Sequence, residues 1–181
     1  MRSSHYAILG LLLLTALTGC VSVKSNVDPQ FDEQVESVFI VSRSHSSIDR
    51  FVNGLTQAMA SRLARQGVRV EYHISDPMSL ELEQGVDAKV DEFGADAVLL
   101  IVPTERSTVD GLNKAVTMDF SLIPVGGERI AWRADVRSEG SGFGDLGNTT
   151  EIADKAVDKM LEDGLRLGIV RAGTPAGDAA P

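Results

Sequence analysis

The sequence predicts one α/β domain with a mixed sheet, in the element order β-α-β-α-β-β-β-α. Five short segments carry contiguous or alternating apolar residues, as strands do, and three segments repeat apolar residues at the spacing of a helix face. The chain has 181 residues, of which 43% are hydrophobic, and this length suits a single core. We expect a five-stranded sheet with its helices packed mainly on one face.

Residues 1–19 have the composition of a signal peptide. Arg2 provides a positively charged start, and residues 6–17 are apolar except for Gly10 and Thr15. This apolar run is shorter than the roughly 20 residues that a membrane-spanning helix needs. We therefore expect the leader to be removed from the mature protein.

The leader runs into Leu17-Thr18-Gly19-Cys20, which contains the only cysteine of the chain. This run resembles the bacterial lipoprotein signal, Leu-(Ser/Thr/Ala)-(Gly/Ala)-Cys, at all four positions. The resemblance implies cleavage before Cys20 and attachment of diacylglycerol and palmitate chains, which together anchor a protein durably. Because Val21 follows the cysteine in place of Asp, the resemblance points to the outer membrane, facing the periplasm. The alternatives are a plain secretory leader with a stray cysteine and an uncleaved anchor.

The rest of the chain divides into three parts by composition. Residues 20–36 are polar and mixed and include Asp28-Pro29, which predicts a flexible, lipidated tether. Residues 37–170 hold all the expected helices and strands and form the periplasmic domain. Residues 171–181 are rich in Ala, Gly and Pro and are expected to be disordered.

The first half of the domain alternates strands and helices. Residues 37–42 are contiguous and β-branched or aromatic, which suits a strand buried on both faces, and residues 96–102 are expected at the sheet centre. Residues 68–73 alternate and indicate a half-buried edge strand. Between these strands we expect two amphipathic helices, one ended by Gly67 and a weaker one ended by Gly94. This order predicts parallel β-α-β units.

The second half predicts an antiparallel hairpin followed by a helix. Gly126-Gly127 is a turn signal between two segments of alternating residues, each with one polar face. In chain order we expect a polar loop at 104–113, strands at 115–122 and 130–136, a glycine-rich loop at 138–147 and a helix over 148–161.

Charge and composition exclude several function classes. The chain has a net charge of −9 and no run of basic residues, so nucleic-acid binding is not expected. A single cysteine cannot form an internal disulfide. His45 and His73 are the only histidines after the leader, and neither has a second ligand at metal-binding spacing. We therefore expect neither a metal nor a cofactor, and we assign no catalytic residue.

Residues 142–147 match the pattern G-x-G-x-x-G of phosphate-binding loops. They follow an expected antiparallel hairpin instead of the first strand of a β-α-β unit, and the carboxylates of Asp145 and Glu151 would repel an anion. We interpret the segment as a loop whose glycines adopt positive φ angles, and the role of the wider run 140–147 stays open.

Arg129, Arg133 and Arg137 recur at every fourth position along the last expected strand. Such a row would contact an acidic partner, peptidoglycan carboxylates or lipid phosphates. The alternative is pairing with Asp119 across the hairpin.

A second resemblance rests on two segments of the chain. One contains the only tryptophan and runs Gly127-Glu128-Arg129-Ile130-Ala131-Trp132-Arg133, and the other is Ala95-Asp96-Ala97-Val98. Across residues 37–168 the chain resembles the TolB-N-terminal-like, or anticodon-binding-like, α/β domain of CsgG- and LpoB-type lipoproteins. The resemblance implies assembly, secretion or activator roles through protein contacts. The lipoprotein LptE also joins a lipidated cysteine to a small α/β domain, although the second helix here departs from it.

The sequence thus predicts a lipid-anchored, non-enzymatic interaction module that faces the periplasm from the outer membrane. It would act with an envelope protein partner as an accessory or scaffold in cell-envelope assembly or transport. The alternatives are a cell-wall-acting hydrolase and a small-ligand or nucleotide sensor. No nucleophile or carboxylate pair stands near a base at a recognisable spacing, which favours the interaction module.

Overall fold

The computed structural model describes residues 21–44, 47–75, 83–109, 112–139 and 149–168. The main sheet consists of β1 (Val21–Val27), β3 (Ser37–Arg43), β4 (Arg69–Ser75), β5 (Ala97–Val109), β6 (Leu112–Pro124) and β7 (Trp132–Glu139). A two-stranded parallel sheet pairs β2 (Gln34–Val35) with β8 (Arg166–Leu167). The helices are α2 (Asp49–Arg65), α3 (Glu83–Phe93) and α4 (Thr149–Glu162).

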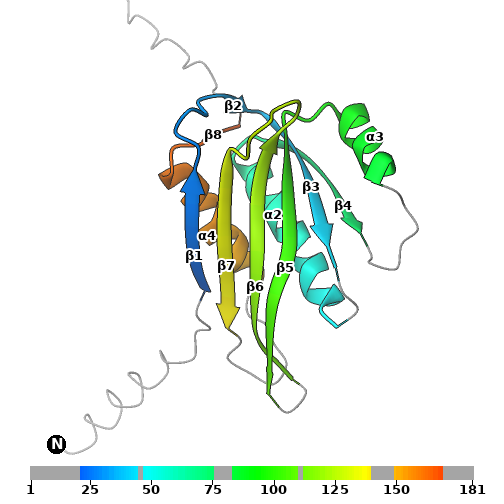
Figure 1. Ribbon diagram of the computed structural model, residues 1–181, viewed down its shortest axis with the longest axis vertical. Helices are drawn as coiled ribbons and strands as arrows, with labels where there is room; N and C mark the ends of the chain where they lie inside the picture. The colour runs from blue at the N-terminus through cyan, green and yellow to red at the C-terminus, as the bar shows by residue number, and fades with distance from the viewer. Residues whose placement is uncertain (1–20, 45–46, 76–82, 110–111, 140–148, 169–181) are drawn as a thin grey trace, which may run out of the picture.

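The main sheet has the strand order β1-β7-β6-β5-β3-β4 (Figure 1). Strands β3, β4 and β5 are parallel, and β5, β6, β7 and β1 are successively antiparallel. The predicted mixed α/β domain is confirmed. Strand β5 lies in the middle of the sheet and β4 at an edge, as their apolar and alternating patterns predict.

Strand β1 corrects the prediction of a flexible tether over residues 20–36. Residues 21–27 pair with β7 along their whole length and make the sheet six-stranded. Val21, Val23 and Val27 pack against the core and Ser25 faces the same side, while Ser22, Lys24 and Asn26 are exposed. The segment is polar on average, yet its period of two is that of an edge strand with one buried side.

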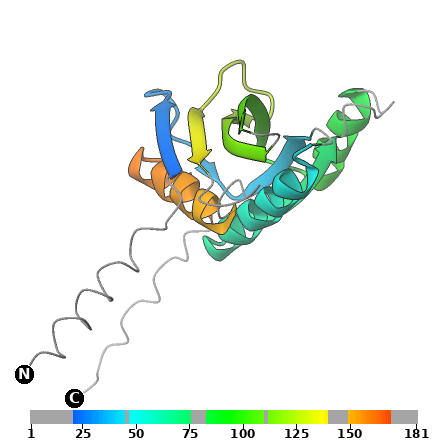
Figure 2. The same cartoon turned by 90° about the horizontal axis from the view of Figure 1, so that it is seen from below.

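Helices α2 and α4 lie side by side on one face of the sheet (Figure 2). They enclose the main core, whose largest buried side chains are Trp132, Phe120, Ile40, Leu55, Met59, Leu63, Leu99, Ile101, Met118, Leu122 and Ile152. Helix α3 packs on the opposite face, where Val90 contacts the cluster of Phe39 and Val41 on β3. That opposite face is therefore covered at the β3–β5 side, and none of the helices in the described part of the chain packs on its β6, β7 and β1 side.

The guanidinium group of Arg69, the first residue of β4, fixes the end of α3. It donates hydrogen bonds to the carbonyl oxygens of Phe93 and Gly94 at 2.9 and 2.8 Å, and it lies 4.4 Å from the centre of the Phe93 ring. A cation at this position satisfies carbonyl groups that have no partner within the helix. Gly94 ends the helix with a φ of 66°.

The hairpin of β5 and β6 is longer than predicted. Residues 104–113 were expected as a polar loop, but β5 continues to Val109 and β6 begins at Leu112. The pairing of β5 with β6 continues through these polar residues, with register shifts between Pro103 and Glu105 and between Ser107 and Thr108. An exposed two-stranded arm needs no apolar face, so its sequence resembles that of a loop.

Gly168 follows β8 with a φ of 83° and donates its backbone N–H to the Val35 carbonyl oxygen. A Cβ atom at this position would overlap the Gln66 carbonyl oxygen at the end of α2. Only glycine fits this close approach of two backbones.

Several predictions fall on residues outside the described ranges. These are the signal peptide, Cys20, His45, the glycine-rich run 140–147 and the tail 171–181. Within the described residues, no helix combines the length and the apolar character that crossing a membrane requires.

Candidate functional site

The β1, β7 and β6 part of the sheet, on the face away from α2 and α4, presents charged and polar side chains, and we call it the open face. On β7 the buried residues alternate with exposed ones, so Arg133, Asp135 and Arg137 point away from the core. The register places Asn26 and Lys24 of β1 beside Arg133 and Asp135. On the other side of β7 the neighbours are Ser121, Asp119 and Thr117 of β6.

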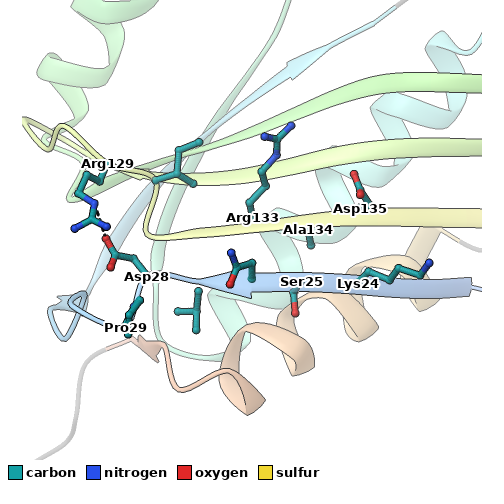
Figure 3. A pocket seen from close by; sticks show the side chains of 11 residues that line it. Lys24, Ser25, Asp28, Pro29, Arg129, Arg133, Ala134 and Asp135 are labelled. Atoms are coloured by element: carbon teal, nitrogen blue, oxygen red, sulfur yellow. Dashed lines mark ion pairs between the residues drawn. The ribbon is translucent and has the colours of Figure 1, made fainter.

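A shallow pocket of about 810 Å³ lies where β1 and the segment before β7 meet (Figure 3). Its charged lining comprises Lys24, Asp28, Arg129, Arg133 and Asp135. A second hollow of about 350 Å³ lies at the other end of the face, where Arg137 meets Thr117 and Glu105. Both hollows are open and have mixed polar and apolar linings, which suits an extended surface contact better than an enclosed small molecule.

Arg133 pairs across the hairpin with Asp119. Its Nε lies 2.7 Å from Asp119 Oδ2, and its Nη2 bonds the same oxygen, while the Ser121 hydroxyl donates to Oδ1 at 2.9 Å. Asp119 is buried, and its carboxylate raises the pKa of the Arg133 guanidinium by hydrogen bonding and by charge. The sequence analysis gave this pairing of Arg133 with Asp119 as the alternative to contact with an acidic partner.

The three arginines do not form one row, which corrects the sequence prediction. Arg133 and Arg137 share the outward side of β7, but Arg129 lies in the connection before the strand begins at Trp132. The connection turns the chain, so a spacing of four residues does not continue a strand face there.

Each of the three guanidinium groups has a carboxylate partner within the chain. Arg129 Nε lies 3.1 Å from Asp28 Oδ2, and Arg137 Nε lies 3.0 Å from Glu139 Oε1. The arginine side chains of the three pairs remain 64%, 61% and 52% exposed in the order Arg129, Arg133 and Arg137. The carboxylates of Asp28 and Asp119 are only 9% and 12% exposed, whereas Glu139 is 53% exposed, so only the Arg137–Glu139 pair is a surface pair that contributes little to stability.

Trp132 lies on the opposite side of β7 and is fully buried. Its Nε1–H donates to Asp163 Oδ2 at 2.8 Å, the Ser25 hydroxyl of β1 donates to the same oxygen, and Lys159 Nζ lies 2.7 Å from Oδ1. Partial burial pushes the pKa of Asp163 up, but the Lys159, Ser25 and Trp132 donors outweigh it and hold this pKa below its ordinary value. Asp163 therefore joins β1, β7 and the end of α4.

Sequence reasoning did not find Asp163. The residue follows the last turn of α4 and precedes Gly164, so it resembles an ordinary helix end. Its partners Ser25 and Trp132 are 138 and 31 residues away in the chain. Only the fact that a buried indole N–H requires an acceptor could have indicated that such a residue exists.

Asp96, in the run 95–98 that carries the family resemblance, has a structural role. Its Oδ2 accepts the backbone N–H groups of Glu36 and Ser37, both at 2.8 Å, and so ties the start of β3 to the start of β5. Partial burial pushes the pKa of Asp96 up, but these donors, the Ser37 side chain and the Arg69 charge together lower it.

The remaining candidates do not gather into a site. His73 lies on β4, with its Nδ1 3.4 Å from Lys89 Nζ of α3. Asp91 and Glu92 are exposed on α3. Among the described residues, no group of three or more His, Cys, Asp or Glu side chains could hold a metal ion.

No protein-family model matches the chain, and no curated protein matches it either. Among solved structures, the fold is similar to the PelC dodecamer from Paraburkholderia phytofirmans, with a TM-score of 0.51 and 17% identity over 80% of this chain and 96% of that chain. A second dodecamer, of a single-residue variant of the same PelC, gives a TM-score of 0.51 and 21% identity over 74% and 93%. Protein XCC0632 from Xanthomonas campestris, of family DUF330, gives 0.40 and 12% over 82% and 98%. At these identities the similarity to PelC establishes a shared fold.

Proposed function

We propose that this protein is a lipid-anchored, periplasm-facing interaction module of the outer membrane that serves cell-envelope assembly or transport without catalysis. The run Leu17-Thr18-Gly19-Cys20 supports the anchor and the address. The resemblance to CsgG- and LpoB-type lipoprotein domains supports a role through protein contacts.

The open face is the observation that carries this proposal. One side of the sheet is closed by α2 and α4, while the β1, β7 and β6 part of the other side presents charged side chains in shallow hollows. A buried partner interface needs shape and charge complementarity more than a deep pocket. The exposed pair of Arg137 and Glu139 can be exchanged for pairs with a partner at little cost in folding stability, and the guanidinium groups of Arg129 and Arg133 remain accessible to a partner.

The arrangement of carboxylates on this face favours binding over hydrolysis. Asp119 and Asp135 stand opposite each other on β6 and β7, but Arg133 pairs with Asp119, and Lys24 is the register neighbour of Asp135. A glycosidase uses a pair of carboxyl groups on its substrate, and here the carboxylate of Asp119 is buried and already bound by Arg133.

Copies of the same chain are among the partners we propose. Both PelC structures with this fold are dodecamers. Strands β1 and β4 are the edges of the main sheet here, and edge strands are natural sites for contact with another chain.

Site-specific photo-crosslinking in intact envelopes tests the proposed function. A crosslinking residue replaces Asp135 on the open face in one variant and Asp158 on α4 in a matched control, since both are exposed aspartates. We expect protein adducts from position 135 at a yield about tenfold above that from position 158. Equal yields, or adducts from position 158 alone, would contradict the assignment of the open face.

A further inference from the structure

We propose that copies of this chain join head to tail, with strand β1 of one copy pairing antiparallel to strand β4 of the next. The main sheet then continues from copy to copy. The inference rests on the part of the proposed function that admits copies of the same chain as partners, and it names the two surfaces that meet.

Strands β1 and β4 lie at opposite edges of the six-stranded sheet (Figure 1). Within the described residues, no strand pairs with the outer side of either one. Strand β4 runs parallel to β3 and β5, whereas β6, β7 and β1 reverse direction in turn, so β1 and β4 run in opposite directions. A second copy placed beside β1 in the same orientation therefore presents its β4 antiparallel to β1.

The outward backbone groups of β1 belong to its odd-numbered residues. The N–H of Asp28, directly after β1, donates to the Ala131 carbonyl oxygen before β7, so the even-numbered residues direct their backbone groups towards β7. The carbonyl oxygen of Val21 points away from β7, because it accepts a hydrogen bond from Lys155 Nζ at 3.0 Å. The odd-numbered residues of β1 can therefore bond to a further strand.

On β4 the even-numbered residues point outward. The N–H of Arg69 donates to the Glu36 carbonyl oxygen, and the Ser75 carbonyl oxygen accepts the N–H of Ser44, so the odd-numbered residues face β3. In an antiparallel pair, opposite residues direct their backbone groups either both towards or both away from each other. An odd-numbered residue of β1 must therefore stand opposite an even-numbered residue of β4. This rule also places both side chains on the helix-covered side of the sheet.

Both edges carry incompletely covered apolar side chains on that side. Val21 and Val23 of β1 are only partly buried, and so are Val70 and Ile74 of β4. Tyr72, between the last two, is 43% exposed. A continued sheet sets these side chains against one another and removes apolar surface from water. Pairs of aromatic and β-branched residues across antiparallel strands add to the stability of the contact.

The charges on the other side of the sheet distinguish between the possible registers. Lys24 of β1 and Glu71 of β4 are both exposed there, and opposite charges on facing strands attract. A shift of two residues places Lys24 opposite Arg69 or opposite His73, and neither of these carries a negative charge. We therefore expect the register with Lys24 opposite Glu71.

The same register also matches the apolar side chains. With Lys24 opposite Glu71, Val23 stands opposite Tyr72 and Val21 opposite Ile74. A symmetric contact between two β1 strands offers Lys24 no carboxylate, because β1 contains none. Charge and apolar surface thus both favour the head-to-tail arrangement over a pair of β1 edges.

Disulfide trapping in the full chain, kept in its own envelope membranes, tests the contact. In the proposed register, positions 24 and 71 of different copies face each other without mutual backbone hydrogen bonds, with Cα atoms about 4.5 Å apart, which a disulfide can bridge. Within one copy they lie at opposite edges of the sheet. The variant with both Lys24→Cys and Glu71→Cys should therefore form dimers and longer chains when oxidised with copper phenanthroline.

Asp135→Cys with Glu71→Cys is the matched control, because position 135 is exposed on the same face but lies one strand inside the edge. It should give a yield about tenfold lower, since a disulfide requires Cα atoms within roughly 7 Å. Mass spectrometry of the linked peptides should identify the 24–71 bond. Absence of this bond, equal yields from the two variants, or 24–24 or 71–71 dimers from the single cysteine variants would overturn the head-to-tail contact.

Charge reversal tests the register without new cysteines. Lys24→Glu sets two carboxylates opposite each other and should weaken the association about tenfold, measured by native mass spectrometry of the protein in detergent micelles. Adding Glu71→Lys restores opposite charges and should bring the association back to within about twofold of the original. Because the two positions lie at opposite edges of one chain, this recovery can arise only between copies. No weakening by the single variant, or no recovery in the double variant, would overturn the register.

The two proposals fail separately. The photo-crosslink at position 135 reports on the open face, whereas the 24–71 disulfide reports on the edges of the sheet. Adducts of position 135 with another envelope protein, without the disulfide, would overturn only the edge contact. The disulfide without adducts from position 135 would contradict only the assignment of the open face.

Discussion

The two faces of the β1–β7–β6 sheet are built from alternate residues of the same strands, yet they have opposite properties. On β7, Trp132, Ala134 and Val136 are almost completely buried under α4, while Arg133, Asp135 and Arg137 between them are exposed. The helix-covered face holds a polar contact at Asp163, and the open face carries ion pairs whose arginines are exposed. The comparison teaches that stability resides on one face and that the other is free to serve recognition.

The largest effect should come from the centre of the helix-covered face. Trp132→Ala removes a fully buried ring and should lower the free energy of unfolding by about 3–5 kcal/mol, because it leaves a cavity. Denaturant unfolding followed by circular dichroism measures this change. A near-neutral result would mean that the ring is not part of the core.

Gly168→Ala should have the next largest effect. The added Cβ meets the Gln66 carbonyl oxygen at the end of α2, and the residue has a positive φ. Strain and overpacking together should cost about 2–4 kcal/mol. Gly164→Ala is the matched control, because Gly164 also has a positive φ but nothing lies within 4 Å of its Cβ position. A thermal midpoint no lower for Gly168→Ala than for Gly164→Ala would contradict the close approach.

Asp163→Asn should cost about 1–2 kcal/mol at neutral pH, because Lys159 loses the nearer of its two carboxylate partners and the amide replaces one acceptor. The effect should depend on pH. The folded state holds the pKa of Asp163 below its ordinary value of 3.8, so the stabilisation is present above about pH 4 and is lost as the pH falls through the folded pKa. Unfolding curves for the two proteins should therefore converge as the pH falls below about 4. A constant difference over that range would show that the charge is not involved.

The smallest effect on stability should come from the open face. Asp135→Asn changes an exposed side chain and should alter the free energy of unfolding by less than about 0.5 kcal/mol. The same substitution should weaken crosslinking from neighbouring position 24 to a partner protein. Loss of stability comparable to that of Asp163→Asn would remove the distinction between the faces.

The local periodicity of apolar residues predicted those strands and helices that depend on neighbours in sequence. The alternation around Trp132 predicted strand β7, and the apolar run 96–102 predicted the central strand β5. Strand β1 has the same period of two, but Ser25 occupies one of its inward positions, so polar composition concealed the pattern.

Contacts between distant segments were beyond this kind of reasoning. Arg129 lies beside Asp28 and Gln30, and Trp132 lies beside Asp163, because strand register and the path of α4 bring them together. A spacing of four residues could suggest an arginine row but could not show that the strand begins only after Arg129. Pairing partners are set by tertiary structure, which a single sequence does not state.

The mass of the protein purified from its native envelope tests the central claim most directly. The account predicts a chain that begins at Cys20 and carries a diacylglycerol and a further acyl group on that residue. A retained leader, or an unmodified residue 20, would contradict the membrane anchor.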